Sequence, residues 1–113
     1  MTGRNILTTA PPYPVEQVLK QLGANLRTAR LRRNLRIQDV AEKIGTGPRP
    51  VSNAEQGKPS TTVAVYIALL WAYDLMDALK EIADPALDKE GLALTLPRER
   101  ARARQPKSLD NDF

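Results

Sequence analysis

The stretch that most constrains the fold of this chain is residues 37–57, IQDVAEKIGTGPRPVSNAEQG. Its first half carries four apolar residues at the spacing of one helix face: Ile37, Val40, Ala41 and Ile44. Gly45 follows, and because glycine lacks a Cβ it can take the left-handed conformation that ends a helix. A second short helix, which would bury Val51 and Ala54, then runs to Gly57. Two helices joined by so short a turn form a helix-turn-helix, whose second helix is free to enter a DNA major groove.

The positive charge of the chain is concentrated around this motif. The net charge is +4, and residues 20–59 carry nine Lys or Arg against three Asp or Glu, whereas residues 60–96 carry two against six. A charged run taken alone is more often a solvated face. Because the excess coincides with the motif, it favours contact with the phosphates of double-stranded DNA.

Composition argues against an enzyme. The chain has no cysteine and no histidine, which excludes thiolate metal sites and removes the commonest general base. The glycines of Gly45-Thr46-Gly47 follow a helix and lack the Lys-Ser/Thr of a phosphate-binding loop. We therefore expect no catalytic residue, no metal and no cofactor. Without a long apolar run or a leader segment, the expected location is the cytoplasm, at the nucleoid, with no membrane contact.

The order of the chain predicts an all-α protein. Residues 1–13 contain adjacent prolines and no periodicity, which is typical of a flexible N-terminal arm. Residues 14–84 predict a five-helix domain that contains the helix-turn-helix and three more helices, over residues 14–33, 63–73 and 75–84. Asn34 and Asp74 are expected to take left-handed conformations at helix ends. Asp84-Pro85 should stop the fifth helix, because the residue before a proline avoids the α region.

The segment after this domain allows two interpretations. LALTL, residues 92–96, alternates like a strand, which would need a partner such as the same strand of a second subunit. Alternatively it is a short helix or irregular segment that packs its leucines on the fifth helix. Residues 85–97 are therefore expected to contact a second subunit or a partner. Residues 98–113, which are charged and poor in apolar groups, predict a disordered basic tail.

The aromatic residues of the fourth helix also allow two interpretations. Tyr66, Trp71 and Tyr73 hold most of the aromatic area of the chain. Packing in the core is the favoured interpretation, and a subunit or partner interface, where Trp and Tyr are enriched, is the alternative.

The segment LRTARLRRNLRIQDVAEKIGTGPRPVSNAEQG resembles the first three helices of lambda-repressor-like, or XRE-type, helix-turn-helix proteins, and no gap is needed across residues 22–57. Ala41 matches the small contact position of the family's second helix, and Gly45 matches its turn. Further on, LLWAYDLMDALKEIADPALDKEGLAL resembles the tail of HipB-type antitoxins, through Asp84-Pro85, Asp88 and Gly91-Leu92. Lys89 stands where that pattern has a second proline.

The resemblance implies a role for each residue of the third helix that it matches. Arg49 and Asn53 lie four residues apart, at positions that contact base edges in the family, and such side chains can bond guanine and adenine respectively. Arg30 and Glu55 match an internal ion pair of the family. Other residues are implied to hold phosphates or to add positive charge near them: Ser52, Gln56, Lys58, Ser60, Arg36 and Arg32.

Three departures from the family pattern affect this site. Arg36 and Ile37 stand where the family usually has a capping Ser or Thr followed by Gln, so a helix cap and a phosphate donor are missing. Pro48 replaces a residue that often carries a base-contacting amide, and it cannot donate a hydrogen bond.

Pro50, in the DNA-contacting region, is the third departure. Proline disfavours α geometry in the residue before it, here Arg49. Either the third helix starts at Pro48 with Arg49 slightly strained, or it starts at Pro50 with Arg49 extended. If the helix starts at Pro50, Arg49 would contact the DNA backbone. Sequence specificity would then depend more on Asn53 and on DNA shape.

The function that the resemblance implies is a transcriptional repressor that regulates its own operon and is the antitoxin of a HipA-like kinase toxin. Because one helix-turn-helix contacts few base pairs, we expect a homodimer on a palindromic operator, with recognition helices about 34 Å apart. The alternative is an adaptor that has lost its operator and acts only through its kinase-like partner.

Overall fold

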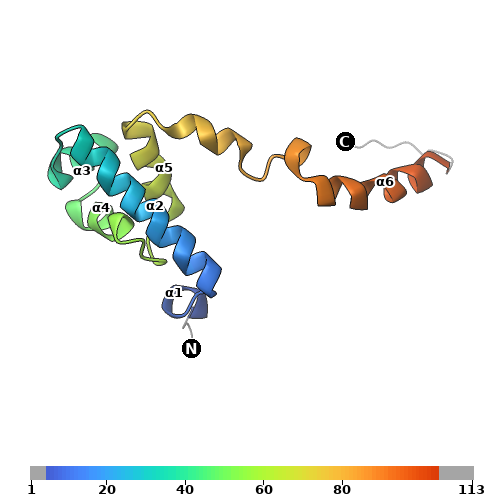
Figure 1. The fold of residues 1–113 in the computed structure, drawn as a ribbon, viewed down its shortest axis with the longest axis horizontal. Coiled ribbons are helices and arrows are strands. Elements are labelled where there is room, and N and C mark those ends of the chain that lie inside the picture. The colour runs from blue at the N-terminus through green and yellow to red at the C-terminus, as the bar shows by residue number, and fades with distance from the viewer. Residues whose placement is uncertain (1–4, 105–113) are drawn as a thin grey trace. The chain divides into compact units, whose positions relative to one another are not determined.

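The computed structural model describes residues 5–104, and all regular elements in that range are helices (Figure 1). The predicted all-α fold class is therefore confirmed. The chain divides into two compact units, Met1–Asp77 and Ala78–Phe113. The boundary predicted from the sequence lies after residue 84.

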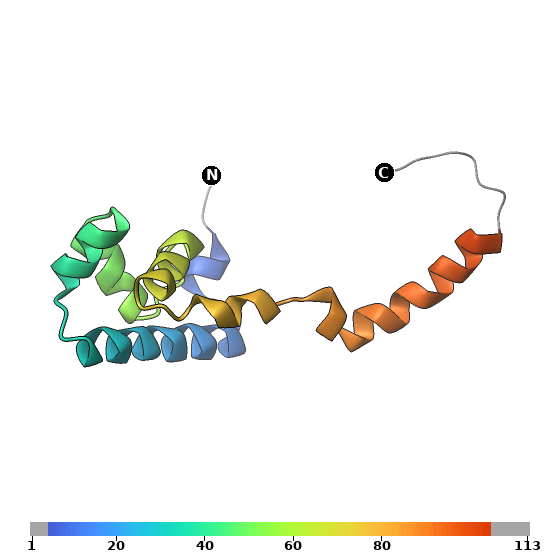
Figure 2. The ribbon, with the colours of Figure 1, turned by 90° about the horizontal axis from the view of Figure 1, so that it is seen from above.

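Four helices make up most of the first unit: α2 (Tyr13–Arg32), α3 (Ile37–Ile44), α4 (Pro48–Glu55) and α5 (Val63–Ala72). The last three lie on one side of the long helix α2 (Figure 2). Helix α4 contacts each of the other three, so it is held from several sides. The side chains between them form one buried apolar core: Leu26, Ala29, Val40, Ala41, Val51, Ala54, Tyr66, Leu69 and Tyr73.

The ends of these helices follow the sequence-based expectations. Asn34, Gly45 and Asp74 have φ angles of 58°, 85° and 60°, so each is left-handed after its helix, as predicted. At the end of α2, Arg33 donates to the carbonyl oxygens of Ala29 and Tyr73, both at 2.9 Å. This side chain ties the end of α2 to the end of α5.

Two glycines bring the backbones of α2 and the end of α4 into direct contact. A Cβ added to Gly23 would lie 2.6 Å from the carbonyl oxygen of Ala54. A Cβ on Gly57, whose φ is 70°, would lie 2.6 Å from the carbonyl oxygen of Leu19. Because the obstructing atoms are backbone, neither position accepts a side chain without a shift of a helix.

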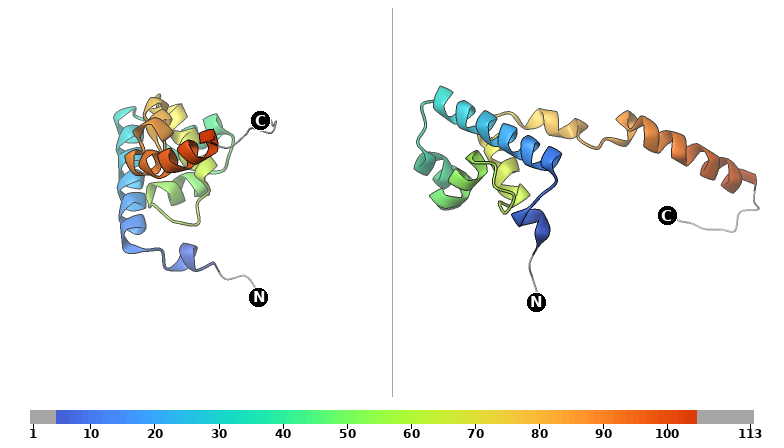
Figure 3. Two further views of the ribbon diagram at one scale, coloured as in Figure 1. Left: turned by 90° about the vertical axis from the view of Figure 1, so that its right-hand side faces the viewer. Right: turned by 60° about the horizontal axis from the view of Figure 1, so that its bottom comes forward.

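The N-terminal arm is helical in part. Helix α1 (Ile6–Thr9) precedes α2 and is followed by a turn of the chain (Figure 3). Asn5 caps it, because its side chain accepts a hydrogen bond from the Leu7 amide at 3.0 Å. The arm that was predicted to be flexible thus contains a short helix in its described part, and residues 1–4 lie outside the described range.

The aromatic residues at α5 were expected to pack in the core, and this holds for only part of them. Tyr66 and Tyr73 are buried, as favoured, but Trp71 is 53% exposed. The Nζ of Lys43 lies 5.7 Å from the centre of a Trp71 ring, within the range of a cation–π contact. The core interpretation is therefore wrong for Trp71. The reason is that α5 is apolar on every side, so its sequence does not tell which face is buried.

The fifth predicted helix is a 3-10 helix, η1 (Met76–Glu81), which spans the division between the units. It ends before Ala83, whose φ is 60°. Asp84 is extended, as expected before Pro85, and its side chain accepts from the Ala86 amide at 2.9 Å at the start of η2 (Pro85–Leu87).

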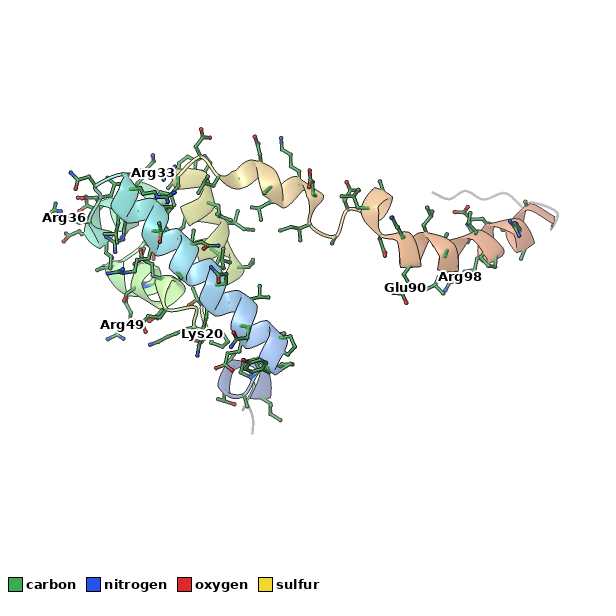
Figure 4. The ribbon with its side chains drawn as sticks, viewed as in Figure 1. Lys20, Arg33, Arg36, Arg49, Glu90 and Arg98 are labelled. Carbon is green, nitrogen blue, oxygen red and sulfur yellow. The ribbon has the colours of Figure 1, made fainter. Side chains whose placement is uncertain are left out.

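The second unit contains one longer helix, α6 (Lys89–Arg104), on which Glu90 and Arg98 are labelled in Figure 4. The strand interpretation of residues 92–96 is therefore wrong. Asp88 starts the helix by accepting from the Gly91 amide at 2.9 Å, and the Leu, Ala, Glu and Arg residues that follow are strong helix formers.

Helix α6 also continues beyond the point where order was expected to end. It passes through Pro97, which has no N–H for the carbonyl of Ala93. Residues 98–104 are helical, so the prediction of disorder is wrong there, since Arg and Ala favour a helix. The rest of the predicted tail, residues 105–113, lies outside the described residues.

Candidate nucleic-acid interface

The outer side of α4 forms an open hollow of about 590 Å³ together with the start of α3. Arg49 is exposed and extends away from α4 (Figure 4), while Ser52 and Asn53 are half-buried. Eight residues line the hollow: Ile37, Gln38, Pro48, Arg49, Ser52, Asn53, Gln56 and Lys58. This face is therefore open to a ligand and is not packed inside the molecule.

The start of α4 decides between the two geometries expected for Arg49. Gly47 is the N-cap, Pro48 is the first helical residue, and Arg49 and Pro50 both belong to the helix. The helix thus starts at Pro48, as in the first alternative. A proline within the first turn removes no intrahelical hydrogen bond, so the helix tolerates both prolines. Arg49 and Asn53 consequently lie one helical turn apart on the same side of α4.

A second hollow continues this surface on the other side of Asn53. Its lining residues are Thr46, Pro50, Asn53, Ser60, Thr61, Thr62 and Val65. Between them the two hollows bring together seven of the predicted contact residues: Arg49, Pro50, Ser52, Asn53, Gln56, Lys58 and Ser60. Gln56 also donates to the hydroxyl of Ser52 at 3.3 Å, which orients both side chains within the first hollow.

Arg32 is not part of this group. It lines a different hollow, with Asn25, Thr28, Ala29, Arg33 and Leu75. The structure therefore does not bring its charge to the residues of α4.

Arg36 is exposed but is engaged with a neighbouring carboxylate. Its Nε and a terminal nitrogen donate to Asp39 at 3.2 and 3.0 Å, and its backbone amide donates to the same carboxylate at 2.9 Å. These hydrogen bonds lower the pKa of Asp39 and raise the pKa of Arg36. Asp39 thus satisfies the backbone amide of the N-cap residue, which is one half of a capping box. No side chain at position 36 accepts from the first amides of α3, as expected from the absence of Ser or Thr there.

The ion pair between Arg30 and Glu55 is present. The guanidinium bonds both carboxylate oxygens, at 2.6 and 3.0 Å, and also donates to the Leu35 carbonyl at 2.9 Å. The two side chains are only 9% and 5% exposed. The hydrogen bonds that Arg30 donates to the Glu55 carboxylate raise the pKa of Arg30, so the guanidinium stays charged. The pair joins α2 to the last residue of α4 and lies away from solvent, which fits a structural role.

Gln38 is a lining residue that sequence reasoning missed. It is exposed in the first turn of α3 and faces the hollow beside Arg49. Its amide can donate and accept, as contacts to DNA require. The apolar residues of α3 could have indicated this position. They place Ile37 on the buried side of the helix, so its polar neighbour Gln38 lies on the outer side.

Comparison with known families agrees with this geometry. A family model described as a helix-turn-helix domain matches residues 21–81, more than half of the chain. The chain therefore belongs to the helix-turn-helix domain family. No curated protein and no solved structure matches it significantly. The matched residues cover α3, α4 and the surface around them, so the chain carries an XRE-like DNA-binding domain.

Residues 5–104 show neither a membrane-spanning helix nor a cluster of metal-ligating side chains. No helix in that range has the length and apolar character that a membrane span requires. Nor does the same range place three or more His, Cys, Asp or Glu side chains where they could hold a metal ion.

Proposed function

We propose that this protein is a sequence-specific transcriptional repressor whose helix α4 enters the major groove of its operator. The observation that carries the proposal is the open face of α4, on which Arg49 and Asn53 lie one turn apart beside the start of α3. The family match supports DNA binding by this region. The excess of Lys and Arg in residues 20–59 supports attraction to phosphates.

The side chains of this face suggest a division of roles. Arg49 has the donors for the O6 and N7 atoms of guanine, and Asn53 can pair with N6 and N7 of adenine. The remaining four residues have the polar groups to hold phosphates along the groove: Ser52, Gln56, Lys58 and Ser60. Arg36 would supply charge at the edge of the site, reduced by its bond to Asp39.

The regulatory context is part of the same proposal. A dimer on a palindrome would supply the specificity that one α4 lacks, with the two copies of α4 about 34 Å apart. The role of antitoxin to a HipA-like kinase toxin, and repression of the shared operon, are supported by the resemblance of residues 69–94 alone. Co-purification of the full chain with the products of neighbouring genes tests that role, and absence of a kinase-like companion would contradict it.

The DNA-binding proposal is tested by fluorescence anisotropy on the DNA upstream of the protein's own coding sequence. Each phosphate neutralised should steepen the dependence of log affinity on log salt by about 0.9. Arg49→Ala and Asn53→Ala should each weaken binding by about 1–3 kcal/mol and relax specificity. Arg27→Ala is the matched control, because Arg27 is exposed on α2 and lines neither hollow of α4.

A second candidate function is the adaptor that binds only a protein partner. The observation in its favour is the exposed apolar row of α5, in which Val63, Ile67 and Trp71 are 69%, 38% and 53% exposed. Exposed apolar side chains at a spacing of four residues share one side of a helix, and apolar patches of that kind are typical of protein contacts. A response to salt that stays flat, together with tight binding of a protein partner, would favour the adaptor over the repressor.

A further inference from the structure

The first turn of α4 carries two prolines on the face that the proposed function assigns to DNA. Pro48 is exposed and lines the hollow beside Arg49, whereas Pro50 is half-buried and lines the second hollow. Of the first three helical residues only Arg49 has an N–H. This helix start is therefore poor in donors for phosphate, and at the two proline positions the only available contact is apolar.

Pro48 does not form this apolar surface alone. Ile37, the first residue of α3, lines the same hollow and packs partly against the core. The hollow thus has an apolar side, made by Pro48 and Ile37, next to the hydrogen-bonding groups of Arg49, Ser52 and Asn53.

The major groove of unmodified DNA offers one apolar group, the C5 methyl of thymine. A methyl group gains free energy when apolar side chains cover it. A polar base edge placed against a proline instead loses water without gaining a hydrogen bond. Both effects act in the same direction, so an apolar surface within a base-contacting site discriminates in favour of thymine.

We propose that Pro48, supported by Ile37, selects a thymine in each half-site by contact with its C5 methyl. This inference rests on the proposed function, because it requires α4 to lie in the major groove. It gives Pro48 a role in specificity, although proline lacks the base-contacting amide that the family often has at this position.

The experiment uses the full chain and a duplex selected from a random-sequence library by its binding. Each thymine of the duplex is replaced in turn by deoxyuridine, which lacks only the methyl group. At one position per half-site, binding should weaken about fourfold, which corresponds to one buried methyl group. Pro48→Ala, which keeps one methyl group in place of the ring, should reduce this sensitivity at that position. Pro50→Ala, whose side chain lines the other hollow, should keep it.

Each other outcome overturns the proposal in a recognisable way. If deoxyuridine has no effect at any position, if Pro48→Ala remains equally sensitive, or if the selected sites contain no thymine, the inference fails while DNA binding stands. If the chain selects no duplex even at low ionic strength, the proposed function fails and takes this inference with it. Circular dichroism of both variants shows whether α4 still forms.

Discussion

The two units of the chain differ in the interactions that stabilise their helices. All buried apolar side chains among the described residues belong to the first unit, where α4 is in contact with α2, α3 and α5. In the described part of the second unit no side chain is buried, and Leu92 and Leu94 of α6 are 55% and 64% exposed. Helix α6 is supported by a capping aspartate and by helix-forming residues.

This difference separates two sources of helical structure. Packing of an apolar face supplies most of the stability of helices in proteins, and an isolated helix of this length is marginal in water. Changes in the first unit should therefore alter cooperative unfolding, and with it the face of α4 that is proposed to bind DNA. Equivalent changes in the second unit should alter only local helix content. Trp71, the single tryptophan of the chain, reports on the first unit alone.

The largest effect is expected from breaking the buried ion pair. Glu55→Ala leaves the charge of Arg30 buried and unpaired, which should lower the free energy of unfolding by about 3–5 kcal/mol. Urea titration followed by Trp71 fluorescence measures it. The double variant Arg30→Met with Glu55→Leu should recover most of the loss, because no buried charge remains. A loss of less than about 1 kcal/mol for Glu55→Ala would show that the pair is effectively solvated.

The backbone contact of Gly23 should give the next largest effect. Gly23→Ala places a Cβ within 2.8 Å of three backbone atoms of α4 and the residues after it. The strain should cost about 1–3 kcal/mol despite the better helix propensity of alanine. Gly47→Ala is the control, because nothing lies within 4 Å of its added Cβ. Similar urea midpoints for the two variants would contradict the close approach of α2 and α4.

The two buried tyrosines should respond differently to loss of their hydroxyls. Tyr66 donates to the Lys58 carbonyl at 3.1 Å, so Tyr66→Phe should cost about 1 kcal/mol. The buried hydroxyl of Tyr73 has no hydrogen-bond partner, and burial raises the pKa of Tyr73 to about 12. Tyr73→Phe should therefore leave stability unchanged or increase it slightly. Equal losses in thermal unfolding would show that both hydroxyls are bonded.

A smaller, pH-dependent effect is expected at Asp39. Its pKa in the folded state lies below the usual 3.8, because Arg36 bonds the carboxylate. The stability it supplies is present above that usual value and is lost as the pH falls through the lower, folded-state pKa. Asp39→Asn should remove this part of the acid sensitivity. Acid titrations of wild type and variant with the same slope below pH 3.8 would contradict this.

The smallest effect on cooperative unfolding is expected for the cap of α6. Asp88→Ala removes the acceptor for the Gly91 amide, so helix content measured by circular dichroism should fall. The unfolding midpoint reported by Trp71 should not move. A shift of that midpoint would show that the second unit contributes to the stability of the first.

The sequence was sufficient for the parts of the fold that depend on strong local signals. The spacing of apolar residues located α3, and the left-handed residues Asn34, Gly45 and Asp74 marked helix ends before their φ angles were known. That Arg49 and Asn53 share one face of α4 also followed from their spacing. Such features need only the geometry of a helix and the properties of single residues.

Features that depend on tertiary contacts could not be predicted in this way. The exposure of Trp71 depends on which face of an evenly apolar helix meets the core. The role of Gly23 depends on the approach of α4, which is distant in sequence. The five-residue run from Leu92 to Leu96 fits the periodicity of a strand as well as that of a helix. The cap at Asp88, which favours the helix, lies outside this run.

The glycine contact between α2 and the end of α4 has a consequence for how new specificities could arise. Since main-chain atoms meet directly at Gly23 and Gly57, the pose of α4 does not depend on the size of any side chain at that contact. The outward residues of α4 can therefore be exchanged as a set while the helix keeps its orientation. In a selection experiment on the first unit, substitutions on the outer side of α4 should therefore change the preferred DNA sequence and leave the fold unchanged.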